Sequence, residues 1–261
     1  MATVKLAIEY DGSQYAGFQS QLNAHTVQDC LEAALLSVSG NVIRVRGAGR
    51  TDSGVHAEGQ VVAFDYDGPL NADDLKRSLN ALLPGDVSIT TAAESSPGFD
   101  PRRDASARVY EYRILNRPER SALHRGRVLW VPQPLDLNLM RRASEAVVGR
   151  HDFRHFATAE SGHVFRHVFE CVCWRQGDQV FIRIRANAFA KRMVRRIAGT
   201  LLQVGLGRWE PQVVSEMLSE IPIAVVAPSL PPHGLYLTCV EYGRRTDIRK
   251  QRATVWNDDW Q

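Results

Sequence analysis

The residues of this chain best suited to chemistry lie in one glycine-rich segment, Gly47–His56. Three glycines, Arg50 and Asp52 fall within these ten residues. Asp52 is the only carboxylate between Glu32 and Glu58, and arginines precede it, so we expect it to be ionised at neutral pH. An ionised aspartate can act as a nucleophile or as a base. The alternative is a tight turn in which the Asp52 side chain caps the backbone.

A second candidate group is the alternating run Arg108, Tyr110 and Tyr112. Alternate residues of a strand point to the same face, so these three side chains are expected to lie together. A tyrosine beside a cationic group can stack on a nucleic-acid base. The alternative is that both rings only cover the core of the protein.

Arg192 and Arg195 form a third group, at the start of an expected helix over residues 189–204. They are three residues apart and should share one face of that helix. Either guanidinium could pair with Asp52 or hold a phosphate. The alternative is that both are solvated charges on a helix surface.

Metal and nucleotide-cofactor sites are not expected. The pairs His151/His155 and His163/His167 have a spacing of four, which suits metal ligation on a helix. However, the second pair falls at the start of an expected strand, and neither pair encloses the glutamate of an H-E-x-x-H motif. The chain also has no P-loop and no G-x-G-x-x-G motif.

The overall composition is that of a globular protein of one large domain or two fused small ones, with 261 residues. No apolar run is long enough for a signal peptide or a membrane span, so no membrane partner is expected. The four cysteines form no Cys-x-x-Cys pair, which fits a reducing, cytoplasmic location.

The charge is distributed unevenly along the chain. Residues 1–100 carry six Lys and Arg against thirteen Asp and Glu, whereas residues 101–261 carry twenty-six against sixteen. Arginine predominates in the second part and includes Arg102 and Arg192. Guanidinium groups suit phosphate recognition, so a nucleic acid is a reasonable partner. The alternative is a solvated basic surface without a partner.

The hydrophobic periodicity predicts two β-α-β-β-α-β units, which is the order of a ferredoxin-like half. The expected strands cover 3–10, 42–47, 58–66, 87–94, 105–115, 164–175, 180–186 and 235–242, and the expected helices 27–38, 71–82, 139–148, 189–204 and 211–218. We therefore expect an α+β protein with an N-terminal half over 1–100 that carries the Asp52 segment. A basic, RNA-binding half follows over 101–243, and a polar tail over 244–261.

The Gly47–Val61 segment closely resembles the active-site motif of the tRNA pseudouridine synthase A family. Further matching segments extend the resemblance from residue 3 to about residue 243: Tyr10–Gln19, Thr26–Glu32, Arg108-x-Tyr110-x-Tyr112, Asp152–Phe156, Ala186–Arg195 and Gly234–Leu237. Phe18 stands where the family usually has tryptophan, and Ser13 where it has threonine. Neither departure affects the residues expected to do chemistry.

The resemblance implies isomerisation of uridine to pseudouridine at tRNA nucleotides 38 to 40, without cofactor or metal, by a homodimer. It also implies a mostly antiparallel central sheet with a basic cleft between the halves. Asp52 corresponds to the nucleophile, which could attack the ribose C1′ or the uracil C6 or drive loss of the base to a glycal. Tyr110 corresponds to the residue that stacks on the target base and assists proton removal, and Arg195 to the partner of the aspartate. Arg50 corresponds to the arginine that holds the base flipped out. Thr51, His56 and Arg108 are expected to contact the substrate, and Arg102 and Arg192 the RNA.

Two other functions are considered from the residues. A non-catalytic RNA-binding protein with two RRM-like halves would carry an RNP1 signature, which is absent. A glycosidase or nucleosidase would normally use two carboxylates, and the glycine-rich segment has only Asp52.

Overall fold

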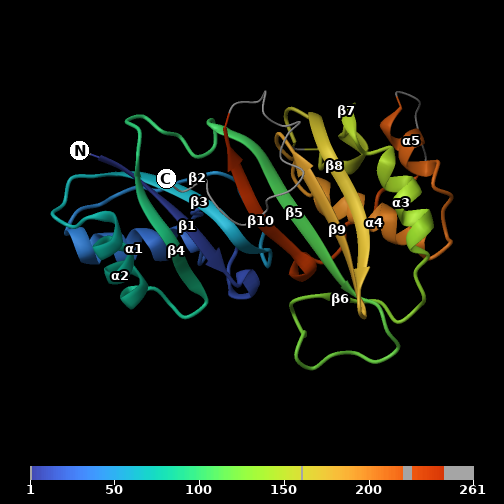
Figure 1. Cartoon of the computed structure of the whole chain (residues 1–261), viewed down its shortest axis with the longest axis horizontal. Helices are drawn as coiled ribbons and strands as arrows, with labels where there is room; N and C mark the ends of the chain where they lie inside the picture. Colours follow the sequence, from blue (N-terminus) through green and yellow to red (C-terminus); the bar gives the residue numbers. More distant parts are fainter. Residues whose placement is uncertain (1, 160, 220–224, 244–261) are drawn as a thin grey trace.

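The computed structural model of the chain describes residues 2–159, 161–219 and 225–243. Its strands form one ten-stranded sheet with the order β4-β1-β3-β10-β5-β9-β8-β7, while β2 pairs with β3 and β6 with β5 (Figure 1). Helices α1 and α2 lie by the β4-β1 end of the sheet, and α3, α4 and α5 lie by the β9-β8 end. The predicted polar tail over 244–261 falls outside the described residues.

The elements have the following bounds. The strands are β1 Ala2–Tyr10, β2 Arg46–Gly47, β3 His56–Tyr66, β4 Val87–Ser95, β5 Ala105–Leu115, β6 Leu129–Trp130, β7 Gly149–Asp152, β8 Phe165–Gln176, β9 Gln179–Ala186 and β10 Leu235–Tyr242. The α-helices are α1 Val27–Ser39, α2 Ala72–Leu82, α3 Leu137–Glu145, α4 Met193–Gly205 and α5 Val213–Leu218. Short 3-10 helices cover η1 Gly12–Gln14, η2 Arg154–Phe156 and η3 Pro232–Gly234.

The two halves of the sheet repeat one strand order. The first half runs β4-β1-β3 with β2 outside β3, and the second runs β10-β5-β9-β8. In the first half, β4 lies beside β1, and β1 lies beside β3. In the second half, β10 likewise lies beside β5, and β5 lies beside β9. The prediction of two β-α-β-β-α-β units in an α+β protein is therefore confirmed. Apart from the short parallel pair of β5 and β6, neighbouring strands are antiparallel within each half.

Local sequence signals account for the helix ends of the first half. The Thr26 side chain accepts a hydrogen bond from the Asp29 backbone N–H at the start of α1, and Gly40 ends the helix in the left-handed conformation. Asn71 caps α2 in the same way. The apolar sides of these helices pack on alternate residues of β1, such as Leu6 and Ile8, which are fully buried.

The halves join where β3 meets β10, and this seam differs from the rest of the sheet. The pairing is parallel and short, with Tyr236 opposite His56 and Leu237 opposite Ala57. A Cβ on Gly59 would lie 2.4 Å from the Thr238 carbonyl oxygen, so only glycine allows this close approach. Farther along the same edge of β3, Val62 and Ala63 pair with β2 instead.

Three local predictions were wrong. The strand expected over 42–47 is reduced to Arg46–Gly47, because the Val45 backbone is hydrogen-bonded to the Gln28 and Glu32 side chains of α1 and not to β3. Helix α4 begins at Met193 rather than at residue 189, because Arg192 adopts a left-handed conformation with φ 64°. Arg192 and Arg195 consequently do not share a helix face. Strands β6 and β7 were not predicted, since two and four residues are too few to show periodicity.

Candidate active site

The Asp52 segment leaves the sheet at the seam between the halves. The Ala48 N–H still donates to the Val61 carbonyl oxygen, at 2.8 Å, but the chain then rises away from β3. A turn closes with a hydrogen bond from Val55 N–H to the Asp52 carbonyl oxygen. Gly54 within it has φ 77°, which explains the glycine at that position. The Asp52 side chain stays 32% exposed, so a substrate can reach the carboxylate.

Asp52 is paired with an arginine from the other half of the chain. Arg195 Nη1 donates to Asp52 Oδ2 at 3.2 Å. Its Nε donates to the Leu230 carbonyl oxygen at 2.7 Å, which holds the guanidinium in place. The first turn of α4 therefore presents a fixed cation to the carboxylate across 143 residues of sequence.

Tyr110 lies on the same side of the sheet and borders the Asp52 segment. A Cβ built on Gly49 would lie 3.6 Å from the Tyr110 hydroxyl oxygen, and the Tyr110 ring meets Phe189 edge-on with centroids 5.1 Å apart. Among the described residues, the hydroxyl has no hydrogen-bond partner. Burial raises the pKa of Tyr110, and the nearby Tyr10 and Asp52 raise it further. The group is therefore a neutral phenol at neutral pH, with its hydroxyl unengaged.

Arg108 is buried, and its guanidinium is occupied by backbone. The group makes five hydrogen bonds to four carbonyl oxygens: two to Ala48 and one each to Ala105, Asn187 and Arg102. Burial lowers the pKa of Arg108, although an arginine stays charged at any ordinary pH. This geometry favours a role in holding the Asp52 segment over the direct substrate contact expected from the sequence.

The other polar residues of the segment differ in accessibility. Thr51 is buried, and its Oγ1 is hydrogen-bonded to the Tyr10 hydroxyl at 2.8 Å. Its side chain therefore fixes the residue that precedes Asp52. Arg50 is exposed and donates from Nε to Gln19 Oε1 at 3.2 Å, which leaves the rest of its guanidinium toward solvent.

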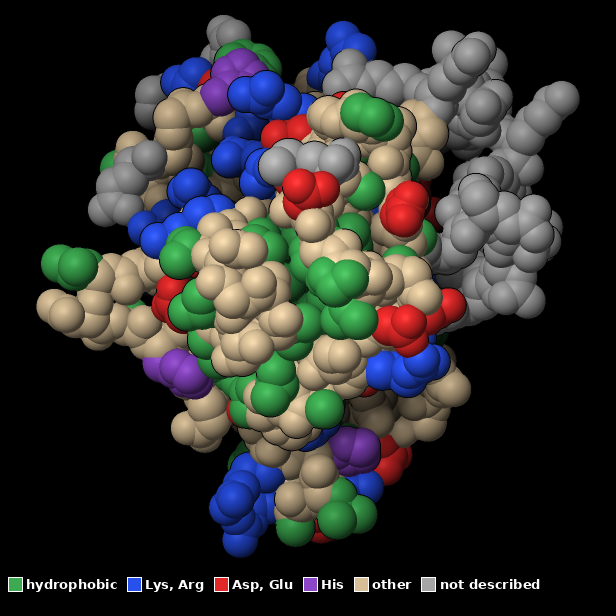
Figure 2. Space-filling model, turned by 90° about the vertical axis from the view of Figure 1, so that its left-hand side faces the viewer, with side chains coloured by type: hydrophobic (Ala, Val, Ile, Leu, Met, Phe, Trp, Pro, Cys, Tyr) green, Lys and Arg blue, Asp and Glu red, His purple; other side chains and the backbone are tan. Residues whose placement is uncertain are grey.

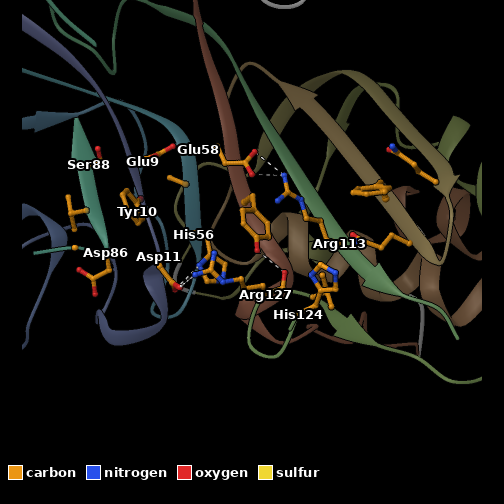
Figure 3. A pocket seen from close by; sticks show the side chains of 18 of the residues that line it. Glu9, Tyr10, Asp11, His56, Glu58, Asp86, Ser88, Arg113, His124 and Arg127 are labelled. Carbon is orange, nitrogen blue, oxygen red and sulfur yellow. Dashed lines mark hydrogen bonds and ion pairs between the residues drawn. The ribbon is translucent and has the colours of Figure 1, made fainter. Parts of the chain in front are cut away.

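His56 follows Asp52 closely in sequence, but its contacts lie elsewhere. It is 2% exposed, accepts from the Gly12 N–H at Nδ1 and meets the Gly126 and His233 carbonyl oxygens at Nε2. It borders a hollow of about 900 Å³ beside Asp11 and Arg127, and Figure 3 shows this cluster. Asp52, Tyr110 and Arg195 do not line that hollow. Burial lowers the pKa of His56, and the opposing effect of Asp11 is smaller.

The two arginines expected to bind RNA, Arg102 and Arg192, are both exposed. Figure 2 shows the end of the molecule that carries α1 and α2, where apolar side chains gather at the centre and Lys and Arg lie toward the rims.

No group of three or more His, Cys, Asp or Glu residues with metal-binding geometry occurs in the described part of the chain. None of the described helices is both long and apolar enough to span a membrane.

Gln60 and Phe189 make contacts in the site that the sequence did not indicate. Gln60 is fully buried and hydrogen-bonded to Gly49 in the Asp52 segment, while Phe189 is half-buried against Tyr110. A buried polar side chain within the apolar run of β3 was the available signal for Gln60.

Together these residues place one accessible carboxylate beside a fixed cation. The segment that carries the carboxylate borders the apolar Leu237 and the neutral phenol of Tyr110, which packs edge-on against Phe189. Such an arrangement can accept a flat, uncharged ring and apply a single nucleophile to it.

Comparisons with known proteins agree with this arrangement. A family model described as tRNA pseudouridine synthase matches residues 6–102 and 143–243. The tRNA pseudouridine synthase A of Syntrophomonas wolfei is 41% identical over 93% of this chain and 98% of its own. The proteins of the same name from Nitrosomonas europaea and Methylococcus capsulatus are 42% and 43% identical, over 94% and 92% of this chain and 91% and 89% of their own.

Proposed function

The chain belongs to the tRNA pseudouridine synthase family and is an isomerase that acts on tRNA; from this premise, we propose that it modifies nucleotides 38, 39 and 40 of the anticodon stem-loop with Asp52 as its nucleophile. The observation that carries the assignment is the accessible Asp52 carboxylate, held by Arg195 at 3.2 Å beside the unengaged hydroxyl of Tyr110.

The reaction requires no change in atomic composition. The N1–C1′ bond of uridine breaks, the uracil turns, and a C5–C1′ bond forms, after which the C5 proton is lost and N1 carries a proton. A single carboxylate suffices if it stabilises the detached fragment, by attack at C1′ or C6 or by promoting a glycal. The fixed Arg195 pairs with Asp52 and orients it for each of these routes.

Tyr110 is proposed to act twice. Its ring, backed by Phe189, offers a flat surface on which the target uracil stacks. Its hydroxyl, free of protein partners, is available to take the C5 proton. Since the pKa of Tyr110 is raised, the phenolate is a strong base but a rare species at neutral pH.

The target base must leave the stacked stem before it reaches Asp52. Arg50 is proposed to hold the flipped nucleotide, because it is exposed and two residues from Asp52. Thr51 and Arg108 are assigned to the support of this segment, since their polar groups are engaged within the protein. His56, which the resemblance grouped with the substrate contacts, is assigned to the neighbouring loops that it bonds.

The tRNA is proposed to lie along the basic half, residues 101–243, with Arg102 and Arg192 among its phosphate contacts. Residues 1–100 supply the Asp52 segment. The working form is proposed to be a homodimer in the cytoplasm, with each tRNA spanning both subunits. Sedimentation of the free protein tests the dimer.

The direct test of the function is incubation with unmodified tRNA transcripts, followed by mapping of pseudouridine at single-nucleotide resolution. Product confined to positions 38 to 40 supports the proposal, and product at other positions contradicts it. Binding without product would instead support a non-catalytic RNA-binding protein, and release of free uracil a nucleosidase.

A further inference from the structure

We infer that Gln60 is a positioning residue for the catalytic segment: its buried carboxamide completes the half-made rung that ends the β2–β3 ladder, binds both polar groups of the Gly49 backbone and so sets the height of Asp52 above the sheet. The inference rests on the proposed role of Asp52.

The antiparallel ladder between β2 and β3 stops one residue after its last regular pair, Gly47 opposite Val62. At the next position the rung is half made, since Ala48 N–H donates to the Val61 carbonyl oxygen but the reverse bond is absent. The Val61 N–H donates instead to Gln60 Oε1 at 3.1 Å. The Ala48 carbonyl oxygen accepts from the Arg108 guanidinium.

The following pair would be Gly49 opposite Gln60, a position at which a regular antiparallel ladder makes no backbone hydrogen bonds. Here the Gln60 side chain binds both polar groups of the Gly49 backbone. Gly49 N–H donates to Gln60 Oε1 at 3.3 Å, and Gln60 Nε2 donates to the Gly49 carbonyl oxygen at 2.6 Å. A carboxamide is the side-chain group that can both accept from an N–H and donate to a carbonyl, as a peptide unit does. It reaches farther than backbone, so the chain at Gly49 stands off from β3.

That displacement is what the seam requires. Just before Gln60, the edge of β3 passes to β10, where Gly59 packs against the Thr238 carbonyl oxygen. A chain that continued to pair with β3 would collide with β10. Raised by Gln60, Gly49 instead faces β10 and β5: a Cβ built on it would lie 3.9 Å from Leu237 Cδ2 and 3.6 Å from the Tyr110 hydroxyl oxygen.

A second route links Gln60 to Asp52. The buried Tyr10 hydroxyl contacts the Gln60 side chain and is hydrogen-bonded to Thr51 Oγ1, so it joins Gln60 to the residue immediately before Asp52. Gln60 thus supports the segment at Gly49 directly and at Thr51 through Tyr10. Displacement of a reacting group by about 1 Å can cost two orders of magnitude in rate.

The test compares Gln60→Met, Gln60→Glu and a matched control. Asn80 also holds a single backbone residue with both amide atoms, accepting from Ile89 N–H at 2.8 Å and donating to its carbonyl oxygen at 2.9 Å, but it lies on α2 away from Asp52. Asn80→Leu therefore removes the same type of interaction without touching the catalytic segment.

For Gln60→Met we expect kcat to fall roughly 30- to 100-fold with the Kd for tRNA within about three-fold of wild type. Asn80→Leu should keep kcat within about two-fold while losing comparable thermal stability. Equal kcat in the folded Gln60→Met and Asn80→Leu proteins would overturn the inference.

Gln60→Glu provides a second test, which holds even if Gln60→Met fails to fold. A buried carboxylate cannot donate to the Gly49 carbonyl oxygen, but a protonated carboxyl can, and burial raises the pKa of such a group. The ratio of variant to wild-type kcat should therefore rise as the pH falls from 8.5 to 6. A ratio that stays flat overturns the inference.

Asp52→Asn measured in parallel separates this inference from the proposed function. An inactive Asp52→Asn beside a fully active Gln60→Met refutes the positioning role alone. An active Asp52→Asn refutes the proposed nucleophile, whatever the Gln60 variants do.

Discussion

Removal of the Tyr110 hydroxyl separates the two roles proposed for this side chain. Because the hydroxyl has no hydrogen-bond partner among the described residues, Tyr110→Phe leaves no buried group unpaired. We therefore expect the free energy of unfolding to change by less than about 1 kcal/mol. Tyr110→Leu also removes the edge-on contact with Phe189, whose centroid is 5.1 Å away, and this contact is worth about 0.5–1.5 kcal/mol beyond its buried area.

The two variants should differ in tRNA binding. Loss of one stacked base costs about 1–3 kcal/mol, which corresponds to roughly 5- to 150-fold weaker binding of the flipped state. Tyr110→Leu should show that loss, and Tyr110→Phe should bind tRNA as wild type does. Turnover should fall in both, since proton transfer by a positioned group contributes about 10²–10⁴-fold.

The assay is release of tritium from tRNA labelled at uracil C5, measured under single-turnover conditions between pH 6 and 9. Burial and Asp52 raise the pKa of Tyr110, so the phenolate fraction, and with it the wild-type rate, should increase with pH over this range. The Tyr110→Phe rate should lack this increase.

Tyr112→Phe is the matched control, because Tyr112 lies on the same face of β5 but donates to the Pro231 carbonyl oxygen at 2.8 Å. It should lose about 1 kcal/mol of stability and keep its turnover. Near-normal pseudouridine formation by Tyr110→Phe would refute the proton-transfer role and leave stacking alone.

Three further predictions follow from the charges and contacts. Charge reversal of the exposed Arg102 or Arg192 should weaken tRNA binding. It should also lower the slope of log K against log salt concentration by about 0.7–0.9 per lost phosphate contact. Lys76→Glu in the acidic half should do neither, and equal effects would disprove the assignment of the basic half. Activity should be unchanged in EDTA, and a loss that zinc restores would contradict the metal-free reaction. The lowered pKa of the buried His56 means that the neutral form is stabilised by folding, so stability is retained above the ordinary value of about 6.5 and lost as the pH falls; urea unfolding between pH 5 and 8 should show a smaller loss in His56→Gln than in wild type, and parallel curves would contradict this.

Much of the fold was predictable because its signals are local. Strand β1 alternates apolar and more polar residues, and β5 and β10 are rich in aromatic and β-branched residues. Helix α1 is marked at both ends, by Thr26 and Gly40. These signals suffice for the β-α-β-β-α-β order of each half.

The seam was not predictable, because it depends on residues far apart in sequence. Nothing local to His56 and Ala57 shows that β10 pairs with them. Nor does anything local to residues 42–47 show that the Val45 backbone bonds to side chains of α1, which leaves β2 only Arg46–Gly47. Likewise, the left-handed Arg192 at the start of α4 has no sequence signal, since glycine is the usual residue there.

For the site, residue types indicated which groups could do chemistry but not what each one contacts. Asp52 Oδ2 and Arg195 Nη1 lie 3.2 Å apart, although 143 residues separate them in the sequence. Arg108 has the side chain of a phosphate ligand, yet its partners are backbone carbonyl oxygens, which no composition can reveal. His56 belongs to the motif in sequence but bonds to loops from other parts of the chain.

The most direct test of the central claim is pseudouridine formation by Asp52→Asn on unmodified tRNA, measured beside the tRNA affinity of the same protein. The amide keeps the shape of the side chain and can still accept from Arg195, but it is no longer a nucleophile. We expect no detectable turnover with a tRNA Kd within a few-fold of wild type. Turnover above about a tenth of the wild-type rate would contradict the assignment of Asp52 as the nucleophile.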